Sequence, residues 1–479
     1  MTTTTDAAVT ALAPFAVLPD WLAAPMRPGA LERSLRRHVP ELAVGRLRLV
    51  DCRTDRLRAK GDQWLTRCRA WVARDDAAGG EPVELVLAGT LRPPGAPEPA
   101  LTGADVPFGQ PGYEVYLPDL RLHLAVEEAD PGLPALAGLA DPEASARLIE
   151  RMLREGGYPQ ARVASSTPHV VRYKPGSRCT IVYDVAYDPP SPELPCPVVA
   201  KTHQGDKGSV AHEAMTALWS TPLAAGDVVR LAEPLGYLPG QRVLLQGPVP
   251  EDRTLKELAR EAFEHGDPDT LDQLRTELGR TAVALAALHR SGALYRRTVT
   301  WRDELAETRE VLDRLSLSVP GLCRAAEPML ARLEALDRAV PADPPVSAHH
   351  DFRPAQVLLD HGAVGFIDFD GAAMAEPGLD LGRFRGKLRD IGVTALSAHE
   401  AGYRPDLLRA RLKLLDELCD EFLDAYRAHA PVRHERVLLW ETIDLLTALL
   451  HTWSKVRLLR VEPRLAILMH QLRTARLEA

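Results

Sequence analysis

The spacing of apolar residues changes once along this 479-residue chain, and the change limits the folds available to it. Before about residue 254, short apolar runs alternate with polar or Pro/Gly-rich turns, which is typical of β-strands. After it, apolar residues recur every three to four positions, which is typical of helices. Two short β-like runs interrupt this helical part, at 356–360 and 363–369. Strands first and helices later predict an α+β fold with segregated elements.

Composition excludes several classes of protein. A hydrophobic fraction of 46% with 26% charged residues is that of an ordinary globular chain. The net charge of −8 argues against a general nucleic-acid binder, which carries a basic surplus. No run of 18 apolar residues occurs, so we expect no membrane contact. The six scattered cysteines form no CxxC pair, and the N-terminus lacks the basic region of a signal peptide, so we expect a cytoplasmic protein with reduced thiols.

The basic residues are unevenly divided between the two types. Of the 58 lysines and arginines, eight are lysines, and most of this bias reflects the Ala, Arg, Leu and Pro usage of a high-GC coding sequence. A lysine at the end of an apolar strand is therefore notable. Lys201 holds such a place, at the end of the run Pro197–Lys201.

The pattern divides the chain into three regions. Residues 1–140 predict a β-rich N-terminal domain, residues 141–250 a strand-rich block with helices at about 142–155 and 209–220, and residues 251–479 a helical block. Residues 58–91 also parallel residues 171–203, since a turn precedes an Arg-Cys pair and two strands in both. This similarity predicts a degenerate copy with Gly89 in the place of Lys201. Coincidence between short strands is the alternative, and strand order distinguishes the two.

The strongest local motif is the apolar hairpin within residues 347–384. It is preceded by Asp351 and followed by Asp368 and Asp370. Such a hairpin brings Asp351, Gln356 and Asp368 to one end, where carboxylate and amide oxygens suit a hard cation such as Mg²⁺. A remaining carboxylate can orient a hydroxyl nucleophile for phosphoryl transfer. The alternative is a pair of solvated acidic turns beside an ordinary hairpin.

This stretch resembles the aminoglycoside phosphotransferase and choline kinase-like superfamily, whose loop has the form H-x-D-x-x-x-x-N, followed by I-D-F and D-L. The resemblance covers about residues 160–430. It implies that Asp351 is the catalytic base, that Asp368 and Gln356 bind Mg²⁺, and that Asp380 braces the loop. It also implies a two-lobed protein-kinase-like fold, here with an additional β-rich N-terminal domain.

Two residues depart from that family pattern. Gln356 stands where the family usually has asparagine, and it keeps the amide oxygen on a side chain one methylene longer. The maltokinase-like branch of the family also has glutamine at this position. His350 replaces the usual glycine, where it either crowds the loop or forms a hydrogen bond.

The resemblance extends to the strand that ends at Lys201 and to the following helix, which carries Glu213. It implies that Lys201 holds the phosphates of ATP and that Glu213 orients this lysine. An edge lysine that extends to solvent is the alternative. The turn containing Gly176 and Ser177 would face phosphate through backbone N–H groups, unless it is simply a type II hairpin turn.

Gln246 and Pro248 lie in an apolar stretch that resembles the strand and hinge whose backbone pairs with adenine. Together these features predict a phosphotransferase that uses ATP and Mg²⁺ and acts on a hydroxyl of a small molecule, such as an aminoglycoside, a sugar or a related metabolite. A pseudokinase or nucleotide-binding module, and a tailoring kinase acting on peptide Ser/Thr, are the alternatives. A partner protein is not excluded.

The acceptor is expected between the catalytic loop and the helices after residue 385. Acidic residues in this region would suit a cationic aminoglycoside, although interleaved arginines favour ordinary helix surfaces. These acidic residues are Asp390, Glu400, Asp406, Asp416, Glu417, Asp420 and Glu421.

Overall fold

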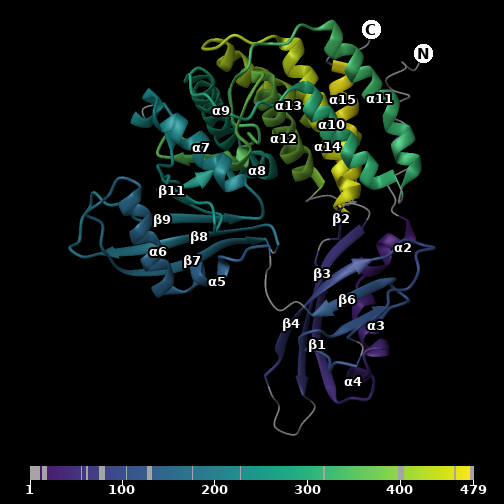
Figure 1. Cartoon of the computed structure of the whole chain (residues 1–479). Coiled ribbons are helices and arrows are strands. Elements are labelled where there is room, and N and C mark those ends of the chain that lie inside the picture. The colour runs from purple at the N-terminus through teal and green to yellow at the C-terminus, as the bar shows by residue number, and fades with distance from the viewer. Residues whose placement is uncertain are drawn as a thin grey trace.

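The computed structural model shows a β-rich N-terminal domain, a small lobe built on a second sheet and a large helical lobe (Figure 1). The predicted α+β, two-lobed, protein-kinase-like architecture is therefore confirmed.

None of the described helices is long and apolar enough to cross a membrane. Glu400 and residues 1–10 lie outside the described part of the chain. The structure describes residues 11–12, 19–55, 57–60, 63–74, 81–103, 105–126, 132–174, 176–226, 228–316, 319–397, 404–457 and 460–474.

The N-terminal domain is an antiparallel sheet of order β1-β3-β4-β6-β5, with β2 paired to β3. Along β4, Leu87, Gly89 and Leu91 are buried at every second position, as a strand with one face on a core requires. Helix α3 packs against β1 and β5. The elements are α2 (Asp20–Ala23), η2 (Ala24–Met26), α3 (Ala30–His38), α4 (Pro40–Ala43), β1 (Leu47–Thr54), β2 (Arg58–Lys60), β3 (Gln63–Arg74), β4 (Val83–Leu91), β5 (Glu114–Leu117) and β6 (Leu122–Val126).

The small lobe is a five-stranded antiparallel sheet of order β11-β12-β9-β8-β7. Helix α6 packs on β7 and β11, and it begins at Pro142 because the Asp141 carboxylate caps it, accepting a hydrogen bond from the Ala144 N–H at 2.7 Å. The elements are α5 (Leu136–Ala140), α6 (Pro142–Glu155), β7 (Val163–Lys174), β8 (Arg178–Tyr187), β9 (Val198–His203), α7 (Lys207–Trp219), η3 (Pro222–Ala225), β10 (Arg230–Leu231), β11 (Pro234–Leu238) and β12 (Val243–Gln246).

The two sheets share one strand order. Counted along each sheet, and leaving out the short β2, both run first, second, third, fifth, fourth. The small lobe inserts α7 between its third and fourth strands, where the described residues of the N-terminal domain form turns and irregular segments. This shared order supports the predicted repeat. The register corrects one detail: when Cys68 is equated with Cys179, Val86 rather than Gly89 takes the position of Lys201, because Arg69 pairs with Val86 and Thr180 with Lys201.

The large lobe surrounds the predicted hairpin, which β15 and β16 form. Helix α12 lies at its centre and packs against α8, α13, α14 and α15. Arg385 and Arg389 of α12 are buried, and each donates a 2.7 Å hydrogen bond to the buried Glu441 of α14. This charge-assisted cluster fixes the position of α12 relative to α14. It thereby also fixes Asp380, in the first turn of α12.

The remaining elements are β13 (Arg253–Thr254), α8 (Leu255–His265), α9 (Pro268–His289), α10 (Trp301–Ser316), α11 (Pro320–Ala339), β14 (Val346–Ala348), η4 (Pro354–Gln356), β15 (Val357–Asp360), β16 (Ala363–Phe366), η5 (Phe369–Gly371), β17 (Ala373–Ala375), α12 (Pro377–Ser397), α13 (Pro405–Arg427), α14 (His434–Ser454) and α15 (Val461–Thr474).

Candidate active site

The loop between β14 and β15 is held in place by Asp380, which lies in the first turn of α12. Its carboxylate accepts hydrogen bonds from the backbone N–H of His349 at 2.6 Å and of His350 at 2.7 Å. The Nε2 atom of His289 lies 3.1 Å from the same carboxylate. Burial alone would raise the pKa of Asp380, but these partners lower it below its usual value. Asp380 thus occupies the bracing position that the sequence suggested.

His350 is held by a hydrogen bond rather than crowded. Its backbone is left-handed, with φ of +70°, and its Nε2 atom lies 2.9 Å from Oε1 of Glu304 on α10. Glu304 also accepts a 2.8 Å hydrogen bond from Arg383. Burial would raise the pKa of Glu304, but Arg383 and His350 lower it to about 2. A side chain at Gly371 would approach His350 to 2.8 Å, so glycine is required opposite the histidine.

Asp351 follows this braced segment and faces the cavity, with its side chain 43% exposed. Arg353 places its Nη2 atom 3.0 Å from the Asp351 carboxylate and donates from Nε to the amide oxygen of Gln356 at 2.7 Å. The amide nitrogen of Gln356 lies 3.4 Å from the same carboxylate. The structure therefore brings together Asp351 and the buried Gln356, with Arg353 bridging them.

Asp368 lies after β16, also in a left-handed conformation, with φ of +75°. Lys201 Nζ donates a 3.0 Å hydrogen bond to its Oδ1, and Arg178 Nη1 lies 3.6 Å from its Oδ2. Burial would raise the pKa of Asp368, but Lys201 and Arg178 hold it well below its usual range. A lysine of the small lobe thus meets an aspartate of the large lobe.

Asp370 adds a second carboxylate beside this pair. His203 Nε2 lies 2.9 Å from its Oδ2, and Arg178 lies 3.7 Å from the same oxygen. Its Oδ1 is buried and has no hydrogen-bond partner among the described residues. An oxygen in this state suits a cation ligand. Neither His203 nor Arg178 was predicted as a site residue, although His203 lies two positions after Lys201 and therefore on the same face of β9.

Glu213 does not meet Lys201. Its carboxylate accepts a 2.9 Å hydrogen bond from the backbone N–H of Arg296, whereas Lys201 is oriented by Asp368. The expectation that Glu213 orients the lysine is therefore not met in this structure, because α7 turns the glutamate towards the large lobe.

The remaining small-lobe candidates lie on the edges of the site. Gly176 has a φ of +64° in the turn between β7 and β8, and the Ser177 N–H donates to the Lys174 carbonyl at 3.0 Å, so this N–H belongs to the turn. Gln246 is buried at the end of β12, and Pro248 follows it in the connection to the large lobe.

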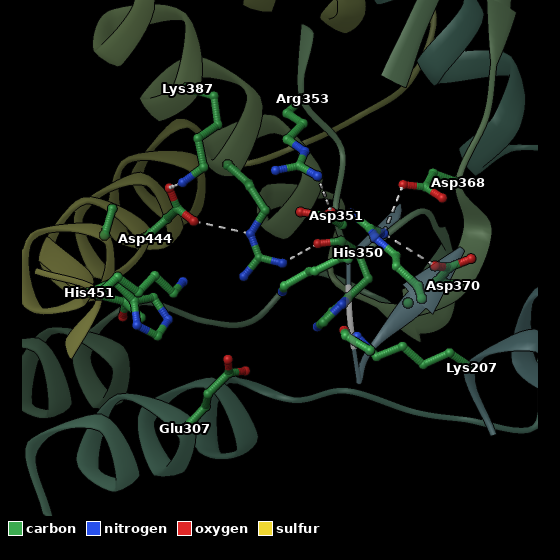
Figure 2. A pocket seen from close by; sticks show the side chains of 18 of the residues that line it. Lys207, Glu307, His350, Asp351, Arg353, Asp368, Asp370, Lys387, Asp444 and His451 are labelled. Carbon is green, nitrogen blue, oxygen red and sulfur yellow. Dashed lines mark hydrogen bonds and ion pairs between the residues drawn. The ribbon is translucent and has the colours of Figure 1, made fainter. Parts of the chain in front are cut away.

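A cavity of about 810 Å³ extends from the β7–β8 turn past the catalytic loop to α12 and α14. Eleven lysines and arginines line it, against six aspartates and glutamates. Figure 2 shows Asp368 and Asp370 at one side, Lys387 and Asp444 at the other, and Asp351 between them. The cavity therefore joins the predicted phosphate-binding groups to a second, positively charged end.

Two lobes, a lysine–aspartate pair between them and a braced H-x-D loop define a protein-kinase-like fold and site. Residues 219–415 match the model of the phosphotransferase enzyme family. A glucosamine kinase from Streptacidiphilus jiangxiensis is 28% identical over 257 residues, which cover 47% of this chain and 55% of that protein. The chain thus matches little more than half the length of this curated relative.

Two solved structures illustrate the wider similarity. A solved structure of a glucosamine kinase (crystal form B) is 20% identical, with a TM-score of 0.48, and covers 95% of this chain and 100% of that chain. A choline/ethanolamine kinase family protein from Mesorhizobium loti is 15% identical, with a TM-score of 0.44, and covers 65% of this chain and 90% of that chain.

Proposed function

We propose that this protein transfers the γ-phosphoryl group of ATP to a hydroxyl group of a small molecule. The observation that carries the proposal is the placement of Asp351, on a loop braced by Asp380, in the same cavity as Asp368, which Lys201 contacts. This arrangement combines an exposed carboxylate for the acceptor with cations for the phosphates. The matching family domain supports the same reaction class.

Asp368 and Gln356 are the proposed Mg²⁺ ligands, and the unpartnered Oδ1 of Asp370 offers a further oxygen. The bound ion would neutralise charge on the phosphates. The amide oxygen of Gln356 accepts a hydrogen bond from Arg353, which it must release to serve as a ligand. Lys201 and Arg178 are placed to hold phosphate oxygens.

The reaction follows from these positions. The acceptor oxygen forms a bond to the γ-phosphorus while the bond from that phosphorus to the β–γ bridging oxygen breaks, and ADP leaves. The hydroxyl proton passes to the carboxylate of Asp351. Positioning and electrostatic stabilisation supply most of the rate enhancement in such transfers.

The test combines nucleotide binding with transfer. We expect MgATP to raise the melting temperature and to be converted to ADP only when a hydroxyl acceptor is present, measured over panels of sugars, sugar acids, aminoglycosides and peptides. Acceptor-dependent ADP release with a small molecule supports the proposal. Binding of MgATP with no transfer to any acceptor indicates a nucleotide-binding module, and transfer to peptides alone indicates a tailoring kinase.

A further inference from the structure

The lysines of this chain are concentrated at the site. Lys174, Lys207, Lys387 and Lys455 line the cavity, and Lys201 contacts Asp368. Five of the eight lysines in a chain with 50 arginines therefore lie at one place. The other three are exposed elsewhere: Lys60, Lys256 and Lys413.

The end of the cavity beyond the catalytic loop has more cations than carboxylates. Asp444 forms ion pairs with both Lys387, at 2.6 Å, and Arg383, at 3.1 Å. Asp390 forms ion pairs with both Arg464, at 2.9 Å, and Arg460, at 3.3 Å. Two carboxylates are thus shared among four cations, which leaves this end positively charged.

Lys455 has no carboxylate partner in the described part of the chain. It follows α14 and is exposed to the cavity. The protein around the cavity partly desolvates its ammonium group, and together with the positive charges of Arg457, Lys174, Arg464 and Lys387 this lowers the pKa of Lys455 to about 8. Lysines from the turn of the small lobe and from the large lobe therefore converge on this end of the cavity, where Glu307 is a further carboxylate and the cations remain in excess.

The acidic residues that would suit a cationic acceptor are already paired. Asp416 pairs with Arg389, Asp420 with Arg385, and Asp406 with Arg404. Glu417 and Glu421 both lie by Arg275. Asp390 is held between the two arginines named above. These pairs match the ordinary helix-surface interpretation of this acidic segment, since each described member of the predicted set has a cationic partner and Glu400 lies outside the described residues.

We propose that the hydroxyl acceptor carries an anionic group, a carboxylate or a phosphate, which Lys455 and its neighbours Lys387 and Arg464 hold while the hydroxyl faces Asp351. This inference rests on the proposed function and names the substrate class of the same site. The phosphates of ATP do not account for the charge at this end, because Asp368 lies on the far side of Asp351 (Figure 2), and Lys201 and Arg178 both contact Asp368.

The first experiment compares acceptors that differ in one group. Acceptor-dependent ADP release is measured with glucose, glucosamine, gluconate and glucose 6-phosphate. We expect kcat/KM for an anionic acceptor to exceed that for glucose by about tenfold or more, and to fall as NaCl is added. Gluconate and glucose 6-phosphate distinguish a carboxylate from a phosphate. Equal or better use of glucose or glucosamine overturns the inference and leaves the proposed function intact.

The second experiment changes the lysine. Lys455→Met is expected to raise KM for the anionic acceptor about tenfold with little change in kcat, and Lys455→Arg to restore it. Lys413→Met, on the exposed face of α13, is the matched control and leaves KM unchanged. A Lys455→Met enzyme with unchanged KM contradicts the inference.

Failure of the proposed function has a different signature, namely no ADP release with any acceptor. Isothermal titration then decides the inference independently of turnover. Gluconate or inorganic phosphate is titrated into protein saturated with MgADP, so that the nucleotide groups are occupied. Binding that Lys455→Met abolishes and Lys413→Met retains supports the anion site. Absence of binding, or binding that Lys455→Met does not change, overturns it.

Discussion

The Nζ atom of Lys201 lies 3.0 Å from Oδ1 of Asp368, and this contact joins the two lobes directly. The lysine lies within β9, a buried strand of the small lobe that continues to His203, and the aspartate follows the hairpin of the large lobe. In the absence of nucleotide each group neutralises the other. If a phosphate and a cation bind between them, the Lys201–Asp368 ion pair would be replaced by two, one between the lysine and the phosphate and one between the aspartate and the cation.

Loss of the lysine tests the role of this pair. Lys201→Met keeps the apolar stem and removes the charge, so we expect MgATP affinity to fall at least about tenfold and kcat about a hundredfold. Nucleotide titration and ADP release measure the two effects. Lys256→Met, at an exposed position of α8, is the control. Wild-type affinity in Lys201→Met would show that the lysine does not hold phosphate.

Asp351 is expected to matter for transfer and not for nucleotide binding. Asp351→Asn keeps the shape of the side chain but cannot accept the hydroxyl proton, so kcat should fall by about a hundredfold or more. The stabilisation by MgATP, measured by thermal shift, should remain. Asp252→Asn, on an exposed turn, is the matched change. An Asp351→Asn enzyme that keeps its kcat would exclude Asp351 as the base.

Asp380 is expected to affect stability first. In Asp380→Asn the carboxylate that accepts from the N–H groups of His349 and His350 is replaced by an amide with one acceptor oxygen. The buried backbone donor left without a partner should cost about 2–3 kcal/mol of unfolding free energy. Urea unfolding measures this, with the exposed Asp424→Asn as control. Equal stability of the two variants would contradict the bracing role.

Glu304 should make the unfolding free energy of the protein sensitive to acid. Its folded pKa of about 2 lies below its ordinary value of 4.5, so its contribution is full above pH 4.5 and decreases as the pH falls towards 2. From pH 5 to pH 3 this amounts to about 2 kcal/mol of unfolding free energy. Urea unfolding across this range should show a smaller loss for Glu304→Gln than for wild type. The exposed Glu307→Gln, one turn along α10, should keep the wild-type slope.

The catalytic hairpin could be predicted because its elements are local. Its strands, its acidic flanks and the aspartate of α12 lie within 38 consecutive residues, so their spacing alone brings them together. The partner of Glu213 could not be predicted, because the rotation of α7 depends on packing against a segment 83 residues away. Local spacing places a glutamate on a helix but does not determine which way that helix face turns.

The positive end of the cavity was also beyond prediction. Arg383 and Lys387 are four positions apart on α12, which indicates a shared helix face. What this face meets depends on the ends of α14 and α15, which tertiary packing brings to it. The acidic residues of this region are evident in the sequence, but only the ion pairs show that the described ones are already neutralised.

The concentration of lysines also makes the site chemically addressable. An amine-directed acylating reagent finds seven exposed or partly exposed lysines on this chain, and four of them face one cavity. Protection of Lys174 and Lys207 by nucleotide, and of Lys387 and Lys455 by acceptor, can be read peptide by peptide in a mass spectrometer. Acylation of these four lysines would remove positive charges that line the cavity.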